Sequence, residues 1–366
     1  MDWQYSVMHL DDTVATIDSE GLCRIIRPDF LPYNLYFEEG SEISTRVENL
    51  NNFHFWCASR VLTLDRKYAK EILNAIGASQ GTTDRERAQV ALTYRCVTLT
   101  DVFWVKNTDE CIPFSQINLY EHPLSDAFVD VSLFGRAPTA QNLELLKPLD
   151  SAGDTSTQGS VPKAWIRRDG FFYLLKDGGN RDVDAELLAS KVARCFAVDQ
   201  VLYEASSYLG TPVTQSRLFT SIDQSIVPMD HVEIYAANHE TSRQNLVDHY
   251  DPYGYHMINI IDYLIGNTDR HWGNWGFLID NETNRPIKLH PLMDFNQSFL
   301  AYDTLEGTRC LTTASPMSQM EAALIGVSAV GLNQQKEVLK EWFTDNRLWN
   351  MFSRRLAILN DHSTMR

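Results

Sequence analysis

The sequence predicts an α+β fold, and three patterns lead to this prediction. Two runs rich in β-forming residues, Lys163–Arg168 and Phe171–Lys176, are separated by an Asp-Gly dipeptide, a favoured hairpin turn. Apolar residues then recur at helical spacing over Asp184–Leu209 and over Tyr255–Ile265. The last part of the chain, about 315–358, is also helical in pattern. A small sheet followed mostly by helices is typical of the α+β class.

Length and charge limit what the chain can be. At about 150 residues per domain, its 366 residues predict about two domains with a sizeable core. The chain carries 32 Lys and Arg against 48 Asp and Glu, which leaves a net charge of −16. Because a phosphate backbone is bound by clustered cations, this balance predicts no direct contact with nucleic acid.

Further features predict a cytoplasmic protein. No apolar run approaches the about 18 residues of a membrane span, and the first residues lack the basic and apolar regions of a secretory signal. The six cysteines have no spacing typical of a metal site. We therefore expect them to be buried, reduced thiols.

A shift in composition divides the chain. The stretch 148–162 is rich in Ser, Thr, Gly, Asp and Pro and has almost no large apolar residues. We therefore expect an N-terminal α+β region at 1–147, a small lobe of sheet and helix at 148–240, and a mainly helical lobe at 241–366. No pattern in the first region has catalytic spacing, and its role is unknown.

Hydrophobic periodicity predicts the other elements in chain order. Strands are expected at Tyr5–Leu10, Leu22–Ile26 and Arg95–Val105, and helices at Phe53–Val61, Arg66–Ile76 and Asp84–Leu92. Further strands are expected at Val213–Phe219, Ile226–Ala236, 275–280 and 287–293. Gly266 and Asn267 are predicted to end the helix that begins near Tyr255.

The first candidate site residues lie just before the hairpin. In Ser156-Thr157-Gln158-Gly159-Ser160, small side chains allow backbone N–H groups to approach phosphate oxygens. The alternative is that this loop is only a linker turn.

A lysine and a glutamate that follow the loop could bind phosphate together. Lys176 ends the second hairpin strand, where an amine can reach phosphates. Glu186, ten residues later, is expected in the first turn of the next helix, where it can hold Lys176 in place. The alternatives are a solvated charge at the strand end and an acid that the helix dipole favours.

The most specific pattern is the segment 269–274. Asp269 is followed five residues later by Asn274, which is the spacing of a kinase catalytic loop: a base for the attacking hydroxyl and an oxygen ligand for a metal. Asp294 follows two short strands and would be the main Mg²⁺ ligand, since hard cations prefer oxygen.

Two alternatives stay open for these residues. Asp269 and Asn274 are also common in turns, and Asp294 is a suitable helix cap. A metal hydrolase would instead use Asp269 and His271 as ligands, with His290 as the third.

These motifs resemble those of the HipA-like serine/threonine kinases, a bacterial family that includes the toxin kinases of toxin–antitoxin pairs. The resemblance covers about 200 residues, and its catalytic-loop part is specific. The matched positions are Ser156, Gly159 and Lys163 of the loop pattern, Asn267, Asp269, His271 and Asn274 of the catalytic-loop pattern, and Pro291 and Asp294 of the metal pattern.

The resemblance implies a two-lobed protein-kinase-like fold, with a small sheet-plus-helix N-lobe and a mainly helical C-lobe. It implies ATP and Mg²⁺ as cofactors and transfer of the γ-phosphate to a protein Ser or Thr hydroxyl. Asp269 would be the base, with Lys176 on the phosphates and Glu186 as its partner. Asn274 and Asp294 would hold the metal.

Further roles follow from the same resemblance. Ser156 occupies the place of a serine that toxin kinases autophosphorylate, which turns the enzyme off. Adenine would be bound near Ile234 and Ala236. The phosphate loop would include Ser156, Thr157, Gly159, Ser160 and Lys163. An antitoxin-like regulator would be a partner, although residues 1–150 do not resemble the usual N-terminal domain of the toxin kinases.

Two further functions are weighed against this one. The Asp-Arg-His-x-x-Asn pattern also occurs in phosphoinositide kinases, but an acidic chain is poorly suited to an anionic membrane. A non-catalytic nucleotide-binding regulator is the other alternative, and it is disfavoured because every catalytic position is filled. A protein kinase is therefore the preferred hypothesis.

Overall fold

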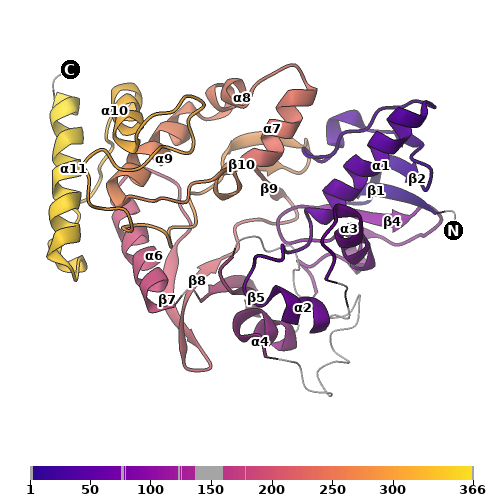
Figure 1. Ribbon diagram of the computed structural model, residues 1–366, viewed down its shortest axis with the longest axis horizontal. Coiled ribbons are helices and arrows are strands. Elements are labelled where there is room, and N and C mark those ends of the chain that lie inside the picture. Colours follow the sequence, from indigo (N-terminus) through magenta and orange to yellow (C-terminus); the bar gives the residue numbers. More distant parts are fainter. Residues whose placement is uncertain are drawn as a thin grey trace. The chain divides into compact units, whose positions relative to one another are not determined.

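The structure, a computed structural model, divides into two compact units (Figure 1). It describes residues 3–75, 78, 80–122, 124, 126–136, 160–177 and 179–364. Unit 1 comprises Met1–Asp177, Arg217–Ile226 and Asp280–Arg285, and unit 2 comprises Gly178–Ser216, Val227–Ile279 and Pro286–Arg366.

An antiparallel sheet forms the centre of unit 1. Its strand order is β3-β2-β1-β4, with β1 at Gln4–His9, β2 at Asp12–Asp18, β3 at Cys23–Ile25 and β4 at Phe103–Asn107. Val7 of β1 pairs with both Ala15 and Val105. A strand with two neighbours has its backbone groups satisfied, so its side chains can be buried from Ser6 to His9.

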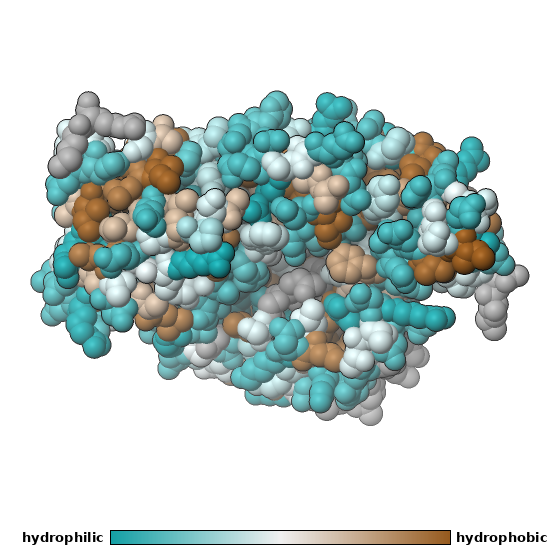
Figure 2. Space-filling model, turned by 45° about the horizontal axis from the view of Figure 1, so that its top comes forward, coloured by the Kyte–Doolittle hydropathy of each residue, from teal (hydrophilic) through white to brown (hydrophobic). Residues whose placement is uncertain are grey.

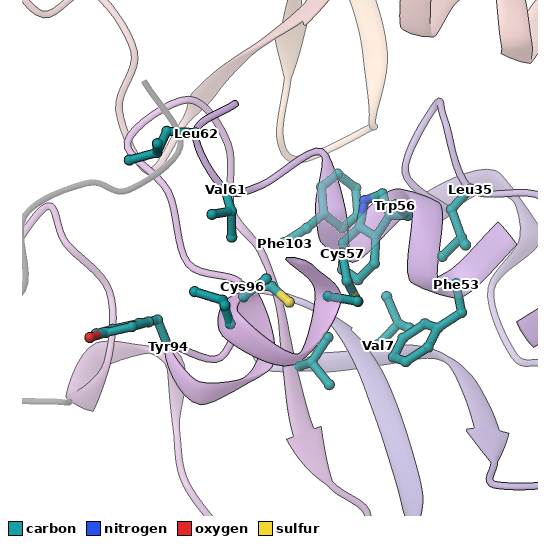
Figure 3. Packing of buried hydrophobic residues seen from close by; sticks show 14 of the residues in the cluster. Val7, Leu35, Phe53, Trp56, Cys57, Val61, Leu62, Tyr94, Cys96 and Phe103 are labelled. Carbon is teal, nitrogen blue, oxygen red and sulfur yellow. The ribbon is translucent and has the colours of Figure 1, made fainter. Parts of the chain in front are cut away.

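Helices share a hydrophobic core with this sheet. They are α1 (Ile43–Ala58), α2 (Ala69–Ala75), α3 (Asp84–Thr93) and α4 (Asp126–Phe134), with short 3₁₀ turns η1 (Pro28–Phe30) and η2 (Phe114–Gln116). Figure 3 shows Phe53, Trp56 and Cys57 of α1 packed near Val7 and Phe103 of the sheet. The six cysteines are free thiols, and burial raises the pKa of Cys57 well above its usual value, so this thiol is inert.

His9 is a buried histidine in this unit, and it makes stability depend on pH. Its ring lies edge-on to Phe30 and Phe103, at centroid distances of 5.1 and 5.0 Å. Burial lowers its pKa from 6.5 to about 4. Between these values the unfolded chain binds the proton more readily than the folded chain. The free energy of unfolding therefore falls as pH falls from 6.5 to 4, by up to about 3 kcal/mol for this group.

We expect His9→Phe to reduce this dependence. Urea unfolding of wild type and variant at pH 7 and pH 4 measures it: the variant should lose less stability between the two values than the wild type. An equal loss in both proteins would show that His9 is not the source.

The predicted hairpin is confirmed in unit 1. Strands β5 (Lys163–Arg168) and β6 (Phe171–Lys176) pair in antiparallel register. Asp169 and Gly170 both have positive φ, 51° and 81°, which is the backbone that a two-residue turn of this type requires.

Unit 2 is mostly helical. Its helices are α6 (Asn180–Ala193), α7 (Met229–Asn238), α8 (Arg243–Tyr250), α9 (Pro252–Ile265), α10 (Gln319–Val330) and α11 (Asn346–Thr364), with 3₁₀ turns η4 (Trp272–Asn274) and η5 (Lys340–Trp342). Helix α9 packs against α10 and α11, which are orange and yellow in Figure 1. It is buried along nearly its whole length and ends at Gly266 with φ 60° and ψ 44°, as predicted.

Short strands accompany these helices. Strands β7 (Tyr203–Tyr208) and β8 (Thr211–Arg217) form an antiparallel hairpin. Strands β9 (Gln224–Pro228), β10 (Gly276–Asp280) and β11 (Arg285–Leu289) form a three-stranded sheet in the order β11-β10-β9.

Several predicted elements are wrong in part. The strand expected at Arg95–Val105 begins only at Phe103, and the helix expected at Phe53–Val61 begins at Ile43 and ends at Ala58. The helix expected to Leu209 ends at Ala193, because the apolar residues beyond it, among them Leu202 and Ala205, lie before and within β7. The strand expected to Ala236 ends at Pro228, which precedes the first residue of α7. Proline is common where a helix begins, and here it marks the change from strand to helix.

The surface in view mixes hydrophilic and hydrophobic side chains. Figure 2 shows the hydrophobic ones in separate small patches between hydrophilic residues. Among the described residues, the helices are too short or too polar for any of them to cross a bilayer.

Candidate active site

The predicted catalytic loop begins where α9 ends, in unit 2. A side chain at Gly266 would place its Cβ 2.5 Å from the Tyr302 ring, so the helix must stop at a glycine. The Asn267 amide then donates to the Asp262 carboxylate at 3.2 Å and accepts the backbone N–H of Asp269 at 3.1 Å. Asn267 thus fixes the direction in which the chain leaves the helix, and Asp269 is the second residue after it.

The buried side chain of Arg270 anchors the catalytic loop through hydrogen bonds. Its side chain is 2% exposed, and it makes two parallel bonds to the Asp262 carboxylate at 2.9 and 3.0 Å. Burial alone would lower the pKa of Arg270, but the Asp262 carboxylate outweighs burial and the net pKa is raised, with a smaller contribution from Asp294. Arg270 is therefore a charged, bidentate anchor.

The same guanidinium joins the two predicted metal ligands. One of its nitrogens donates to the backbone carbonyl of Asn274 at 2.8 Å and to that of Met293 at 2.5 Å. Met293 directly precedes Asp294. Asn274 and Asp294 are 20 residues apart in the sequence, and Arg270 holds their backbones around a single nitrogen atom.

The amide of Asn274 is oriented by the loop itself. Its Nδ2 donates to the backbone carbonyl of Asp269 at 2.8 Å, and the residue is 8% exposed. Because only the nitrogen of an amide can donate, this bond fixes which atom is which, and Oδ1 faces the other way. A hard cation can use this oxygen as a ligand.

Asp294 has an unusual backbone conformation. Its φ is 59°, in the left-handed region that costs a non-glycine residue roughly 1 kcal/mol or more. The hydroxyl of Tyr203 accepts its backbone N–H at 3.0 Å, and Leu292 is hydrogen-bonded to both Asp199 and Val201. Backbone strain held in place by such contacts is typical of functional sites.

The alternative metal hydrolase is disfavoured. Within the described part of the chain, no cluster of three or more His, Cys, Asp and Glu is arranged to hold a metal ion. His271 caps the turn η4, and its Nδ1 accepts the N–H of Gly273 at 3.0 Å. His290 is buried, which lowers its pKa to about 4, and its Nδ1 lies 2.9 Å from the carbonyl of Pro291. Both imidazoles have local structural roles.

Glu186 lies on the buried face of α6. It is 1% exposed, and its carboxylate accepts the hydroxyl of Thr214 at 2.5 Å. The helix begins at Asn180, so Glu186 is in its second turn and not in the first turn as expected. The helix dipole acts mainly on the first turn, so the alternative of a first-turn acid that the dipole favours is not supported.

Two lysines are paired at the open end of the hairpin in unit 1. Lys163 and Lys176 are direct cross-strand partners, 7% and 5% exposed. Like charges in this arrangement are destabilising and favour a nearby anion. Arg66 donates to the carbonyl of Lys163, and the backbone N–H of Lys67 donates to Ser160 at 3.0 Å.

The remaining predicted site residues are those of the phosphate loop and of the adenine-binding segment. Ser156, Thr157 and Gly159 lie outside the described residues, and Ser160 is exposed. Ile234 and Ala236 lie on α7 and not on a strand. Their adenine-binding role, which the family resemblance implies, stays a prediction.

Sequence patterns missed several residues that support the site. The helical pattern predicts only that Asp262 belongs to a helix, although an acid on an otherwise apolar helix face is a signal of a buried partner. Thr214 and Tyr203 gave no such signal, because hydroxyl side chains are ordinary in strands. Arg66 comes from a region with no recognised motif.

Comparison with known proteins bears on the fold. No family model matches the chain, and no curated protein matches it. A solved structure of HipA from Shewanella oneidensis MR-1, in complex with HipB and operator DNA, matches 99% of this chain and 90% of its own at 12% identity, with a TM-score of 0.54. The Helicobacter pylori proinflammatory kinase CtkA matches 56% of this chain and 93% of its own at 13% identity, with a TM-score of 0.41.

The HipA match extends over 99% of the chain, and so into the N-terminal region, whose sequence does not resemble the usual N-terminal domain of the toxin kinases. The predicted α+β, HipA-like kinase fold is confirmed, and the chain has the fold of HipA.

Proposed function

We propose that the protein is an ATP- and Mg²⁺-dependent serine/threonine protein kinase of HipA-like type. One observation carries the proposal: Arg270 holds the backbones of Asn274 and Met293 on one nitrogen, next to the loop that contains Asp269. Phosphoryl transfer needs a base and metal ligands in fixed positions more than it needs covalent chemistry.

The residues of unit 2 fit a magnesium ion. Asn274 Oδ1 and the Asp294 carboxylate are oxygen donors, and two such ligands with substrate phosphates and water are typical of Mg²⁺. The ion would neutralise charge that develops on the phosphates. Asp269 would accept the proton of the attacking hydroxyl and orient it towards the γ-phosphate.

The residues around the hairpin would bind the phosphates. The paired Lys163 and Lys176 supply two positive charges, and Ser156, Thr157, Gly159 and Ser160 would supply backbone N–H groups. Glu186 as the partner of Lys176 and Ile234 and Ala236 near adenine stay predictions. So does autophosphorylation of Ser156.

The partners follow from the proposed chemistry. The acceptor would be a Ser or Thr hydroxyl of a protein, and the protein would act in the cytoplasm. HipA occurs in a complex with HipB and operator DNA. We propose an antitoxin-like regulator as a partner, without direct DNA contact by this acidic chain.

Transfer of labelled γ-phosphate from ATP tests the proposal. The full chain, incubated with a cell lysate and Mg²⁺, should label itself or a lysate protein on Ser or Thr, and excess chelator should abolish the labelling. Mass spectrometry of the labelled protein should find phosphate on Ser156, and Ser156→Ala should lose that peptide.

Three results would argue for another function. ATP binding without transfer would favour the non-catalytic regulator. Labelling of phosphoinositide vesicles in place of protein would favour a lipid kinase. Absence of both binding and transfer would rule out the nucleotide-dependent functions altogether.

A further inference from the structure

The outer side of the catalytic loop carries an exposed tryptophan. Arg270 and Asn274 in this loop are 2% and 8% exposed, whereas Trp272 between them is 38% exposed. Trp272 is three residues from Asp269 and two from Asn274. It belongs to the turn η4, which contacts α7. A large aromatic side chain thus faces solvent beside the proposed base.

A buried arginine covers one face of this ring. The guanidinium carbon of Arg243 lies 4.1 Å from the centroid of the Trp272 ring, a close cation–π contact. Arg243 is the first residue of α8, and its side chain is only 9% exposed. The ring is therefore held in place by a fixed positive charge.

The charge of Arg243 is poorly compensated. Among the described residues, the closest carboxylate is that of Glu233. It lies 3.9 Å from Nη1 of Arg243, which is beyond hydrogen-bonding distance, and the Glu233 side chain is 49% exposed. Within the described part of the chain, Nη1 has no hydrogen-bond partner. The N-terminus of α8 adds partial positive charge, and the first turn contains no acid.

Two other buried arginines, Arg60 and Arg270, differ from Arg243 in that each has a carboxylate partner at hydrogen-bonding distance. Arg60 donates to the Asp101 carboxylate at 2.6 and 2.9 Å and to nearby carbonyls as well. Arg270 donates to Asp262 and to two carbonyls. A buried charged donor without an acceptor destabilises the folded protein, so we expect an anion that binds from outside to form a favourable ion pair with Arg243.

We propose that Trp272 and Arg243 form an acceptor subsite that binds a negatively charged group on the protein substrate. This inference rests on the proposed kinase function and adds a substrate class to it. Asp269 and Trp272 are three residues apart, so their backbones are separated by at most about 10 Å. An extended acceptor segment covers the same distance in about three residues. The anion would therefore lie within about three residues of the phosphorylated hydroxyl. It would be the carboxylate of Glu or Asp, or the phosphate of a residue already phosphorylated, and it would displace the exposed Glu233 from Arg243.

Peptides with a single acceptor serine test this subsite. Three otherwise identical peptide sets carry Glu, Gln or phosphoserine at each position within three residues of the serine. The ratio of kcat/KM for the Glu peptide to that for the Gln peptide should be about tenfold or more at the best position, as expected for a charge-assisted hydrogen bond. A higher value for the phosphoserine peptide would assign phosphate as the anion, and an equal or lower value would assign carboxylate.

Matched variants connect the preference to Arg243. In Arg243→Gln the ratio should fall close to one, and in Arg243→Lys, which keeps the charge without the planar fork, it should be intermediate. Arg347→Gln is the control, because Arg347 is an exposed arginine on α11 with a side chain that is 91% exposed. Its ratio should equal that of the wild type. Melting temperatures show whether each variant is folded.

The results separate this inference from the proposed function. A wild type that transfers phosphate without preferring Glu or phosphoserine, or an Arg243→Gln variant that keeps the preference, would overturn the subsite and leave the kinase function standing. A wild type that neither autophosphorylates nor labels any peptide would overturn both. Binding of labelled Glu and Gln peptides to the full chain, measured by fluorescence anisotropy, gives a readout that does not require turnover.

Discussion

Replacing Asp269 with Asn is expected to lower kcat for phosphoryl transfer by at least about a hundredfold, because an amide cannot accept the proton of the attacking hydroxyl. The backbone of the loop should be preserved, since Asp269 holds it through its N–H to Asn267 and its carbonyl to Asn274. ATP affinity should therefore change little. Single-turnover transfer and equilibrium binding of ATP, measured on the same preparation, separate the two effects.

A surface aspartate gives the control for this variant. Asp361 lies on α11 and is exposed, so Asp361→Asn should transfer phosphate at the rate of the wild type. If Asp269→Asn kept most of its activity, Asp269 would not be the base, and the proposed mechanism would need another one.

Removing the buried charge of Arg270 is expected to destabilise the protein most. Arg270→Met leaves the Asp262 carboxylate, 7% exposed, without its bidentate partner, and breaking such a pair costs about 3–5 kcal/mol. It also removes the bonds to Asn274 and Met293, so the two proposed metal ligands lose their common anchor. Chemical unfolding gives the free energy change, and phosphoryl transfer should fall as well.

A double-mutant cycle measures the interaction between the charges of Arg270 and Asp262, separately from the effect of losing each side chain. Combining Arg270→Met with Asp262→Leu removes both charges, so the double variant should be more stable than Arg270→Met alone. Arg347 and Asp345 form a pair near the surface, and breaking it should change the free energy of unfolding far less, because water screens the two charges. Additive effects of the two buried substitutions would show that the charges do not interact.

Local patterns predicted the elements that depend on local chemistry. The hairpin β5–β6 follows from its β-rich runs and its Asp-Gly turn, and the end of α9 follows from Gly266. The order of Asp269, Asn274 and Asp294 predicted which residues could share a site. Their spacing could not show how the site is held together, because that depends on Arg270 and on contacts between distant segments.

Errors arose where tertiary contacts outweighed periodicity. Apolar residues continued at helical spacing past Ala193, but the segment from Tyr203 pairs with β8 as a strand. The change from β9 to α7 at Pro228 was missed because β-branched residues on both sides resembled one strand. The role of Thr214 as a hydrogen-bond partner of Glu186 depends on a pairing that no local pattern encodes.

The left-handed backbone of Asp294 has a consequence for how this chain can change over time. Glycine adopts this φ at a lower conformational free energy than aspartate, so Asp294→Gly would stabilise the folded protein. Without selection for a carboxylate, mutation would therefore tend to replace Asp294. A chain that keeps aspartate at this position is less stable, but it holds a negatively charged oxygen in a fixed position for the proposed metal site. Loss of activity and gain of stability would coincide at this single position, which makes it a place to distinguish an active lineage from one that has become inactive.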